Sequence, residues 1–274
     1  MSEGNSLMRA KTEVEDPVNK ETYSSAKVIK YYTEYVSLQP PEKTIFDLLA
    51  PSLPSAKMLD IGVGAGRTTE YFAPLVKSYA ACDFVKGMID QCRVKFSARF
   101  PEARFEVGDA KDLHQFANEK FDFILFSFNG IDHMPIASRV QFLQKARALL
   151  APGGHLCFST HNIFSLRRLT VGAVFSWRWN MLATMAKVAR RLKVRRMNAA
   201  ELRTIETADH VFVNDGCHDF GLKLCFMRPS CQIQMLRECG WNNIRAFELE
   251  SGKEFASEKD ICSTETAWIY FLCR

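Results

Sequence analysis

The sequence predicts an α/β fold in which a mainly parallel sheet is covered by helices on both faces. Short apolar segments alternate with segments of helical spacing between residues 57 and 160, as is typical of such sheets. The segment Phe121–Phe128 is almost continuously apolar, which indicates a strand buried on both faces. The 274 residues are 47% hydrophobic and 24% charged, so the chain can bury a sizeable core, and disordered and fibrous classes are excluded.

Proline and glycine set most of the element boundaries. Pro40-Pro41 ends the first expected helix, and Pro152-Gly153-Gly154 ends the helix before the fifth strand. The expected helices cover residues 24–37, 42–50, 68–75, 85–96, 138–150 and 229–239. The expected strands cover residues 57–61, 78–83, 104–107, 121–128, 155–160, 243–250 and 267–273.

The last two strands are expected to pair antiparallel at the sheet edge, because the loop between them is too short for a parallel crossover. Residues 161–228 are too long for an ordinary connection; they contain a basic helical segment, 165–196, and two short strands, 210–213 and 222–227. Since this insertion follows the fifth strand, at the edge where ligands bind, we expect it to form a cap of helix and strand. The expected organisation is a disordered leader (1–20), N-terminal helices (21–56), the sheet domain (57–160 and 229–274) and the cap (161–228).

The cysteines and the N-terminal segment indicate a reducing compartment. None of the nine cysteines forms a C-x-x-C pair, which favours buried thiols over disulfides or a structural zinc site. Residues 1–20 lack the apolar stretch of a secretory signal, so we expect a cytoplasmic protein. The most apolar long window, Val171–Ala189, is interrupted by Arg178 and Lys187 and falls short of a membrane span.

The net charge of +5 is concentrated in one segment. Residues 166–205 contain ten Lys and Arg side chains and a single acid, Glu201, so the rest of the chain is slightly acidic. A solvated helix face explains such a segment without a partner. Otherwise it favours an anionic substrate, a membrane surface or RNA. The aromatic side chains there are few, with Trp177 and Trp179 among them. Their small number and the lack of a separate RNA-binding domain argue against RNA.

The sharpest motif is the glycine loop after the first strand, Asp60-Ile61-Gly62-Val63-Gly64-Ala65-Gly66. Its glycines permit a tight turn and close approach of the backbone to a ligand. A dinucleotide fingerprint requires glycine where Arg67 stands, and the Asp60 carboxylate would repel a pyrophosphate. The same carboxylate suits a ligand that carries an ammonium and a sulfonium, and the helix that follows can accept a carboxylate. S-adenosylmethionine has this charge pattern.

Two further acids stand where such a ligand needs them. Asp83 ends the second strand, 17 residues after Gly66, where a carboxylate can accept both ribose hydroxyls. Asp109-Ala110 follows the third strand, within reach of an adenine amino group. Without a ligand, Asp83 would be a strand-end turn residue and Asp109 a helix cap.

Taken together, these residues resemble the class I S-adenosylmethionine-dependent methyltransferases of the small-molecule type. The resemblance covers about residues 40–160 and the closing helix and strands; it also rests on Met88, on Phe121-Asp122 to Phe128, and on Leu149-Leu150-Ala151-Pro152-Gly153-Gly154. It implies a Rossmann-like seven-stranded sheet of order 3-2-1-4-5-7-6 with strand 7 antiparallel. The implied cofactor-binding residues are Asp60, Gly62, Gly64, Gly66, Asp83, Phe84, Met88, Asp109, Ala110 and Ser127. Met88 also has the spacing of an ordinary core residue.

The methyl acceptor is expected to lie beyond strands four and five. Ser127-Phe128-Asn129-Gly130-Ile131-Asp132-His133 lacks the Asn/Asp-Pro-Pro-aromatic signature of many methyltransferases that modify base amines or glutamine. His133 is a candidate general base and Asn129 a candidate substrate ligand; a helix-entry histidine is the alternative. Asp132, His133 and His161 suggest a divalent metal, but matching acids on strand five are absent, so no metal is predicted.

The cap turn and the first helix supply further candidates. The turn Asn214-Asp215-Gly216-Cys217-His218-Asp219 is longer than a minimal hairpin. We expect His218 to be catalytic and Asn214, Asp215 and Asp219 to contact substrate; a solvent-facing turn is the alternative. Tyr31 and Tyr32 are expected to close the site, unless their helix is simply amphipathic.

The sequence therefore predicts an enzyme that transfers a methyl group from S-adenosylmethionine to oxygen or nitrogen of a small molecule. An anionic acceptor is one form of this hypothesis. The alternatives are an RNA methyltransferase that uses residues 166–205 and a membrane-surface methyltransferase with a lipid-like substrate. A methyltransferase-like regulator without catalysis is less consistent with the intact cofactor motif.

Overall fold

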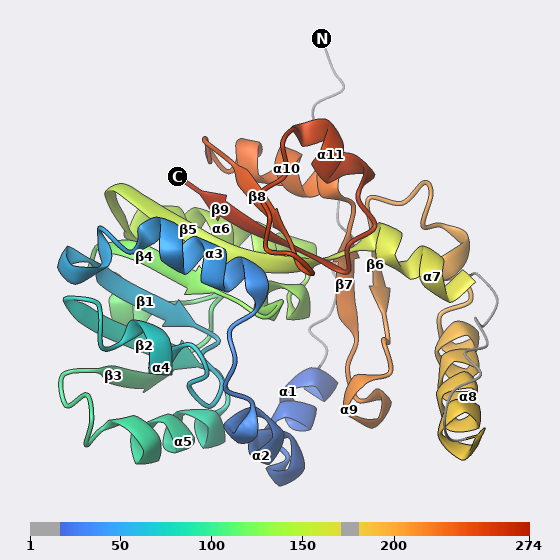
Figure 1. Ribbon diagram of the computed structural model, residues 1–274, viewed down its shortest axis with the longest axis horizontal. Helices are drawn as coiled ribbons and strands as arrows, with labels where there is room; N and C mark the ends of the chain where they lie inside the picture. Colours follow the sequence, from blue (N-terminus) through green and yellow to red (C-terminus); the bar gives the residue numbers. More distant parts are fainter. Residues whose placement is uncertain (1–16, 171–180) are drawn as a thin grey trace.

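The computed structural model describes residues 17–170 and 181–274, which form a mixed sheet of nine strands with helices on both faces (Figure 1). This confirms the predicted fold class. The strands are β1 (Lys57–Ile61), β2 (Ser78–Asp83), β3 (Arg104–Val107), β4 (Phe121–Phe126), β5 (Leu150–Asn162), β6 (His210–Val213), β7 (Leu224–Met227), β8 (Arg245–Glu248) and β9 (Trp268–Cys273).

The α-helices are α1 (Pro17–Ser24), α2 (Ala26–Glu34), α3 (Pro40–Leu49), α4 (Thr69–Phe72), α5 (Lys86–Phe96), α6 (Ile136–Leu149), α7 (Arg167–Thr170), α8 (Met181–Met197), α9 (Cys217–Phe220), α10 (Pro229–Glu238) and α11 (Glu258–Ser263). Short 3₁₀ turns are η1 (Leu53–Ser55), η2 (His114–Phe116), η3 (Gly130–His133), η4 (Ile163–Leu166) and η5 (Glu201–Arg203).

The N-terminal region differs from the expected single helix over 24–37. Helix α1 begins at Pro17, inside the segment expected to be a disordered leader, and residues 1–16 lie outside the described residues. Ser25 separates α1 from α2 because its side chain accepts a hydrogen bond from the backbone N–H of Val28, an N-cap. Proline is favoured in the first turn of a helix, which fits the start of α1.

The main sheet has the order β3-β2-β1-β4-β5-β9-β8. Strands β1 to β5 are parallel, while β9 runs antiparallel between β5 and β8. This arrangement confirms the predicted order 3-2-1-4-5-7-6 with its antiparallel last strand. It also brings the carboxyl ends of β1, β2 and β4 to one edge.

The cap extends this sheet instead of forming a separate layer. Strand β5 continues to Asn162, and its last residues pair in parallel with β7, which pairs in turn with β6. The cap has its own apolar cluster, which includes Ile163, Val213 and Phe226. Helix α8 lies at the far end of the cap from the sheet domain, at the right of Figure 1.

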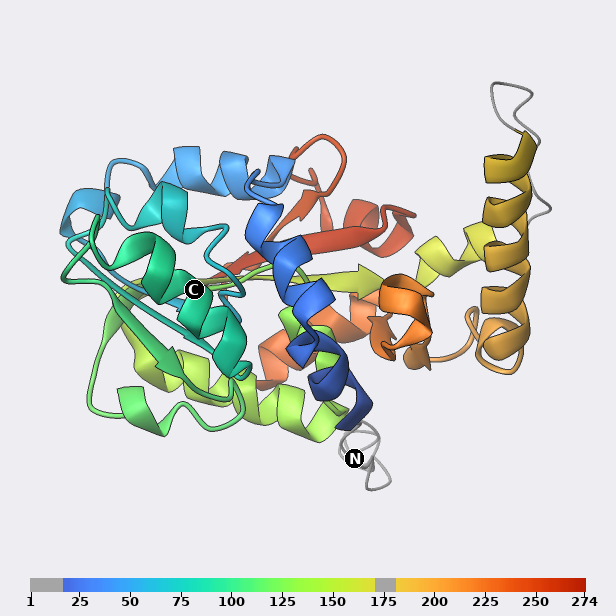
Figure 2. The ribbon, with the colours of Figure 1, turned by 90° about the horizontal axis from the view of Figure 1, so that it is seen from below.

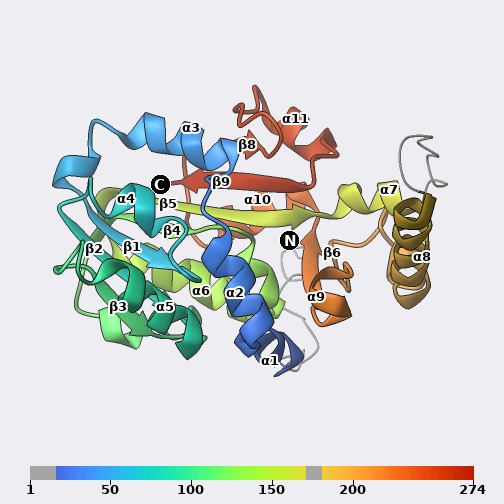
Figure 3. The same cartoon turned by 60° about the horizontal axis from the view of Figure 1, so that its bottom comes forward.

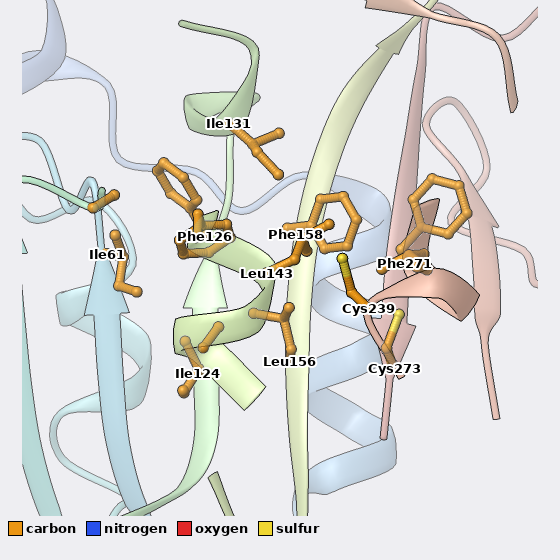
Figure 4. Close-up of a cluster of buried hydrophobic side chains, with 14 of the residues drawn as sticks. Ile61, Ile124, Phe126, Ile131, Leu143, Leu156, Phe158, Cys239, Phe271 and Cys273 are labelled. Carbon is orange, nitrogen blue, oxygen red and sulfur yellow. The ribbon is translucent and has the colours of Figure 1, made fainter. Parts of the chain in front are cut away.

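The core forms two layers, one on each face of the sheet. One cluster packs β1, β4, β5 and β9 against α6 and α10; Figure 4 shows part of it, extending across the sheet from Ile61 through Ile124 and Phe158 to Phe271. The other packs the opposite face against α3, α4 and α5. All nine cysteines are free, and seven are buried. In the described parts of the chain, no helix combines the length and the apolarity needed to cross a bilayer.

Candidate active site

A cavity of about 780 Å³ lies at the carboxyl ends of the parallel strands. Figures 2 and 3 show α1 and α2 lying across these strand ends, with α9 of the cap beside them. The predicted residues that line the cavity are Tyr32, Asp60, Gly62, Gly64, Asp83, Phe84, Met88, Asp109, Ala110, Ser127 and His133. The predicted residues outside its lining are Tyr31, Gly66, Asn129, Asn214, Asp215, His218 and Asp219.

The three glycines of the loop have different tasks, although all adopt positive φ. At Gly64 an added Cβ would meet nothing within 4 Å, so its backbone faces open space in the cavity. At Gly66 an added Cβ would lie 2.2 Å from the ring of Phe96. Gly66 therefore lets the loop pack against α5, which corrects its assignment to the wall of the cofactor site.

Asp60 is buried at the end of β1 and lines the cavity. Its Oδ2 accepts hydrogen bonds from the hydroxyls of Thr68 at 2.5 Å and Tyr79 at 2.7 Å. Burial raises the pKa of Asp60 to about 6, although both hydrogen bonds favour its ionised form. The described contacts leave Oδ1 for a ligand.

Asp83 joins the glycine loop to the start of α5. Its two oxygens accept hydrogen bonds from the backbone N–H groups of Gly64 (2.9 Å) and Val85 (2.8 Å). Burial raises the pKa of Asp83 to about 6. Since each carboxylate oxygen can accept a second hydrogen bond, Asp83 can still receive two hydroxyls from the cavity.

The remaining predicted cofactor residues form the next part of the wall. Asp109 is exposed, and its Oδ1 accepts from the backbone N–H of Lys111 at 2.9 Å. Phe84 and Met88 pack together in a small apolar cluster at this edge. Met88 is thus both a core residue and a cavity residue, so its two interpretations are compatible.

A buried ion pair beside Ser127 was not anticipated. Ser127 donates to Glu42 of α3, and the guanidinium of Arg67 pairs with the same carboxylate, with one contact of 2.6 Å. Arg67 lies 5.0 Å from the ring centroid of Phe128, and its side chain is 10% exposed. The only sequence signal was a charged residue at the position where the dinucleotide fingerprint has glycine.

His133 lies opposite the glycine loop in the cavity wall and contacts α1. Its Nε2 lies 3.2 Å from the hydroxyl of Tyr23, and its Nδ1 lies 3.3 Å from the amide nitrogen of Asn19. Burial lowers the pKa of His133 to about 4, so its imidazole is neutral at physiological pH. Tyr23 and Asn19 were missed because α1 fell partly within the expected leader.

The cap turn contacts α1 and α2 and does not enter the cavity. His218 adopts a positive φ of 45°, and its Nε2 lies 3.5 Å from the hydroxyl of Tyr32. The exposed Asp219 forms an ion pair of 2.6 Å with Lys27 of α2. Tyr31 is 52% exposed and touches the His218 ring from the other side. The turn therefore supports Tyr32, which lines the cavity.

The other polar candidates of the turn hold its backbone. Asn214 donates from its side chain to the carbonyl of Phe220 at 2.6 Å and accepts from the N–H of Gly216 at 3.0 Å. Asp215 accepts from the N–H of Cys217 at 2.8 Å. Direct substrate contact by Asn214 and Asp215 is therefore not supported by this geometry.

Asn129 and Asp132 belong to a buried polar network behind the cavity. The backbone N–H of Asn129 donates to Ser159 at 2.8 Å, and its side chain lies 3.3 Å from Nε2 of His161. Asp132 pairs with Arg139, and Nδ1 of His161 lies 2.7 Å from its Oδ2. Burial raises the pKa of Asp132, but Arg139 and His161 outweigh it and hold that pKa below its usual range. These contacts fix the end of β5.

Residues 58–154 match the family model described as a methyltransferase domain. The match contains the glycine loop, both strand-end acids and strands β1 to β4, all arranged around the cavity described above. Residues 58–154 thus match a methyltransferase domain, and solved S-adenosylmethionine-dependent methyltransferases share the fold of the chain; both findings support the class I S-adenosylmethionine-dependent methyltransferase family. The resemblance inferred from the motifs is thus confirmed.

Two curated relatives share part of this methyltransferase domain. The chain is 33% identical over 117 residues to the biotin biosynthesis bifunctional protein BioHC of Cellvibrio japonicus, which is 42% of this chain and 22% of that protein. It is 27% identical over 111 residues to the ubiquinone biosynthesis O-methyltransferase of Xanthomonas campestris pv. campestris, which is 40% of this chain and 45% of that protein. The chain therefore spans less than half the length of these relatives.

A solved methyltransferase matches nearly the whole fold. The 1,6-didemethyltoxoflavin-N1-methyltransferase of Burkholderia thailandensis superposes with a TM-score of 0.60 at 14% identity, over 97% of this chain and 92% of that chain. At this identity the likeness shows the fold alone. The cap is thus included in the matched architecture.

The residues that line the cavity fit S-adenosylmethionine. The open space at Gly64, the free oxygen of Asp60, the remaining lone pairs of Asp83 and the apolar side chains of Phe84 and Met88 face one cavity. Ammonium, hydroxyl and adenine groups each have a chemically matching partner there.

The basic segment 166–205 contributes none of its described residues to the cavity lining. Arg167 pairs with Glu206 at 2.6 Å and Glu265 at 3.1 Å, and Arg190 donates to the carbonyl of Gly216 at 2.8 Å. Arg178, Trp177 and Trp179 lie outside the described residues. A role of this segment as a gate for an anionic substrate is therefore not supported, while RNA and membrane contacts stay predictions.

Proposed function

We propose that this protein transfers a methyl group from S-adenosylmethionine to an oxygen or nitrogen atom of a small molecule. The observation that carries the proposal is one cavity that is lined both by donor-binding and by acceptor-binding candidates. Its lining includes the glycine loop, Asp60 and Asp83, and it also includes His133 and the tyrosines of α1 and α2, Tyr23 and Tyr32. A donor and an acceptor can therefore meet inside it.

The names of the relatives support both kinds of acceptor atom. The Xanthomonas relative is an O-methyltransferase, and the Burkholderia neighbour is an N-methyltransferase with a bound small molecule. The position of α1 and α2 across the cavity supports an acceptor small enough to be enclosed (Figure 2). Enclosure matters because methyl transfer requires alignment of the acceptor lone pair and exclusion of water.

In this proposal, different residues hold the methyl donor and the methyl acceptor. Asp60 and Asp83 orient the donor through its ammonium and ribose groups, and the Gly64 backbone allows it to approach the loop. Tyr23 and Tyr32 line the same cavity, and His133 holds the hydroxyl of Tyr23. The cofactor supplies an electrophilic methyl group when bound. What the protein adds is the in-line position of the two reactants and a path for the proton that the acceptor loses.

The first test is calorimetric titration of the full chain with S-adenosylmethionine, followed by a screen of small-molecule extracts with methyl-labelled donor. Asp83→Ala should weaken donor binding strongly while the protein stays folded, and His133→Ala should lower turnover more than donor affinity. If Asp83→Ala binds S-adenosylmethionine as wild type does, the assignment of Asp83 to the donor site is wrong. Donor binding without label transfer to any small molecule, but with transfer to RNA, would favour the RNA alternative.

A further inference from the structure

The two histidines predicted to be catalytic are connected by tyrosines on α1 and α2. His133 in the cavity wall contacts the hydroxyl of Tyr23 at 3.2 Å. The rings of Tyr23 and Tyr32 lie 5.8 Å apart, and the interaction of their hydroxyls contributes to the pKa of each. The Tyr32 hydroxyl lies 3.5 Å from Nε2 of His218. These four side chains, His133, Tyr23, Tyr32 and His218, form a row that leads from the buried cavity to the half-exposed cap turn.

The side-chain amide of Asn19 fixes the direction of the hydrogen bonds. Its Oδ1 accepts from the backbone N–H of Lys223, and its Nδ2 donates to the carbonyl of the same residue, both at 2.9 Å. This double contact excludes a flipped amide, so the group facing His133 is the N–H₂ donor. Nδ1 of His133 must then accept, and the single proton of its neutral ring is on Nε2.

The proton on Nε2 of His133 also determines which atom donates in the contacts that follow. The Nε2–H of His133 donates to the oxygen of Tyr23, so the hydrogen of Tyr23 is free to donate to Tyr32. The hydrogen of Tyr32 then points to Nε2 of His218. A hydroxyl has one hydrogen and two lone pairs, so a single fixed donor at the inner end orients the whole row.

We propose that this row is an outward proton path for the methyl transfer, with Tyr23 as the group that contacts the acceptor and His218 as the final proton acceptor. The inference rests on the proposed function. The acceptor's O–H or N–H proton moves to the second lone pair of Tyr23, the Tyr23 proton to Tyr32, and the Tyr32 proton to Nε2 of His218. The acceptor's lone pair forms the bond to the methyl carbon as the carbon–sulfur bond of the donor breaks.

The degree of burial along the row suits passage of a proton at the inner end and its release to solvent at the outer end. Burial raises the pKa of Tyr23 far above its usual range and lowers the pKa of His133 to about 4, so both stay neutral. His218 is half-buried, which lowers its pKa, while Asp215 and Asp219 favour its charged form and Lys27 opposes it. Tyr23, Tyr31 and Tyr32 are the other titratable groups that face its ring.

In this arrangement His133 is a positioning residue and does not act as the base. Its Nδ1 is occupied by Asn19, and its Nε2 carries a proton that it donates to Tyr23. The positive φ values of His218, Asp219 and Phe220 (45°, 57° and 67°) show a turn held in an unfavourable conformation. Such strain is typical of functional positions, and here it keeps the imidazole against the tyrosines.

The test is NMR of the full chain with ¹⁵N-labelled histidine, which reports the protonation of each ring nitrogen without any ligand. Wild-type protein should carry the His133 proton on Nε2 and should leave Nε2 of His218 unprotonated when neutral. A His133 proton on Nδ1 overturns the proposal. This measurement needs no variant, so it remains decisive if a substituted protein does not fold.

Asn19→Asp should reverse the row, because a carboxylate accepts where the amide donated. The His133 proton should move to Nδ1, and the neutral His218 ring should shift its proton to Nε2. Tyr32→Phe should abolish this effect on His218, whereas Tyr35→Phe, which removes a hydroxyl just beyond the end of α2 and outside the row, should preserve it. If Asn19→Asp moves the His133 proton but leaves the proton of the neutral His218 ring in place, the path is also overturned.

Turnover gives a second measurement. Tyr32→Phe should lower kcat by about 10²-fold, the lower end for lost acid–base catalysis, and should leave the affinity for S-adenosylmethionine alone unchanged. A kcat equal to wild type overturns the path even if the donor binds. Failure of the donor to bind wild-type protein instead refutes the proposed function and leaves the NMR result standing, so the two failures are distinguishable.

Discussion

Binding of S-adenosylmethionine should weaken as the pH falls from 7 to 5, because Asp60 and Asp83 both have pKa values of about 6 in the free protein. The ligand's ammonium and hydroxyls require ionised carboxylates as acceptors. Its own α-amino and α-carboxyl groups keep their charges in this range. Proton uptake by the protein therefore competes directly with the ligand.

The magnitude follows from the ionised fraction. At one pH unit below the pKa, about one carboxyl in eleven is ionised, so each acid should raise Kd about tenfold between pH 7 and 5, and the two together about a hundredfold. Asp83→Asn removes one titration and should reduce the dependence to about tenfold. Its Kd at pH 7 should itself be higher than that of wild type.

Folding stability should change in the opposite direction. The folded pKa of each carboxyl lies above the usual 3.8, so the folded state binds the proton more tightly than the unfolded chain. The free energy of unfolding of the free protein should therefore rise as the pH falls through 6, by about 1 kcal/mol per carboxyl between pH 7 and 5. In Asp83→Asn the rise in the free energy of unfolding should be smaller by the contribution of one carboxyl.

Isothermal titration calorimetry at pH 5, 6 and 7 measures the affinity and, with buffers of different ionisation enthalpy, the protons released. About one proton per carboxyl should be released on binding at pH 5 and almost none at pH 7. A Kd that is constant between pH 7 and 5, or equally steep in wild type and Asp83→Asn, would refute the reasoning. Urea denaturation at the same pH values checks the stability increments.

Three further predictions concern the surrounding structure. Glu42→Gln should lower the free energy of unfolding by about 3–5 kcal/mol in urea denaturation, because the buried Arg67 loses its partner; the exposed Lys43→Gln on the same helix should change it by under about 0.5 kcal/mol, and equal losses would contradict the assignment. Gly66→Ala should cost about 1–3 kcal/mol in thermal denaturation, from its φ of 87° and the clash with Phe96; an unchanged melting temperature would count against it. RNA should not be retained by the protein even at low salt, and retention that falls steeply with added salt would instead support the RNA alternative for α8.

The sheet and the cofactor end of the cavity could be predicted because their signals are local. Each parallel strand is a short apolar segment, and the strand order brings its carboxyl end to the same edge whatever the rest of the chain does. Asp60 and Asp83 stand at the carboxyl ends of β1 and β2, and Gly64 follows β1 closely, so their places along the chain determine where they lie at the sheet edge. Only Gly66, whose neighbour Phe96 is on another element, was assigned to the wrong surface.

The pair of Glu42 and Arg67 could not be predicted in this way. Either residue alone is an ordinary charged side chain, and the sequence shows no sign that α3 packs over the glycine loop. Burial of both charges is tolerated only because each satisfies the other and Ser127 adds a hydrogen bond. Which charged residue pairs with which can be seen in the folded structure but cannot be inferred from the residue types alone.

The acceptor end depends most strongly on contacts between distant parts of the chain. Asn19 bonds to Lys223, Thr22 donates to the carbonyl of Gly221 at 2.7 Å, and Lys27 pairs with Asp219. These contacts join helices α1 and α2 to a turn about 200 residues later, and they place Tyr23 and Tyr32 over the cavity. The His218 ring lies against Tyr23, Tyr31 and Tyr32, so its surroundings depend on both parts of the chain. The proton path that we propose therefore requires the cap and the N-terminal helices together, since its members come from both.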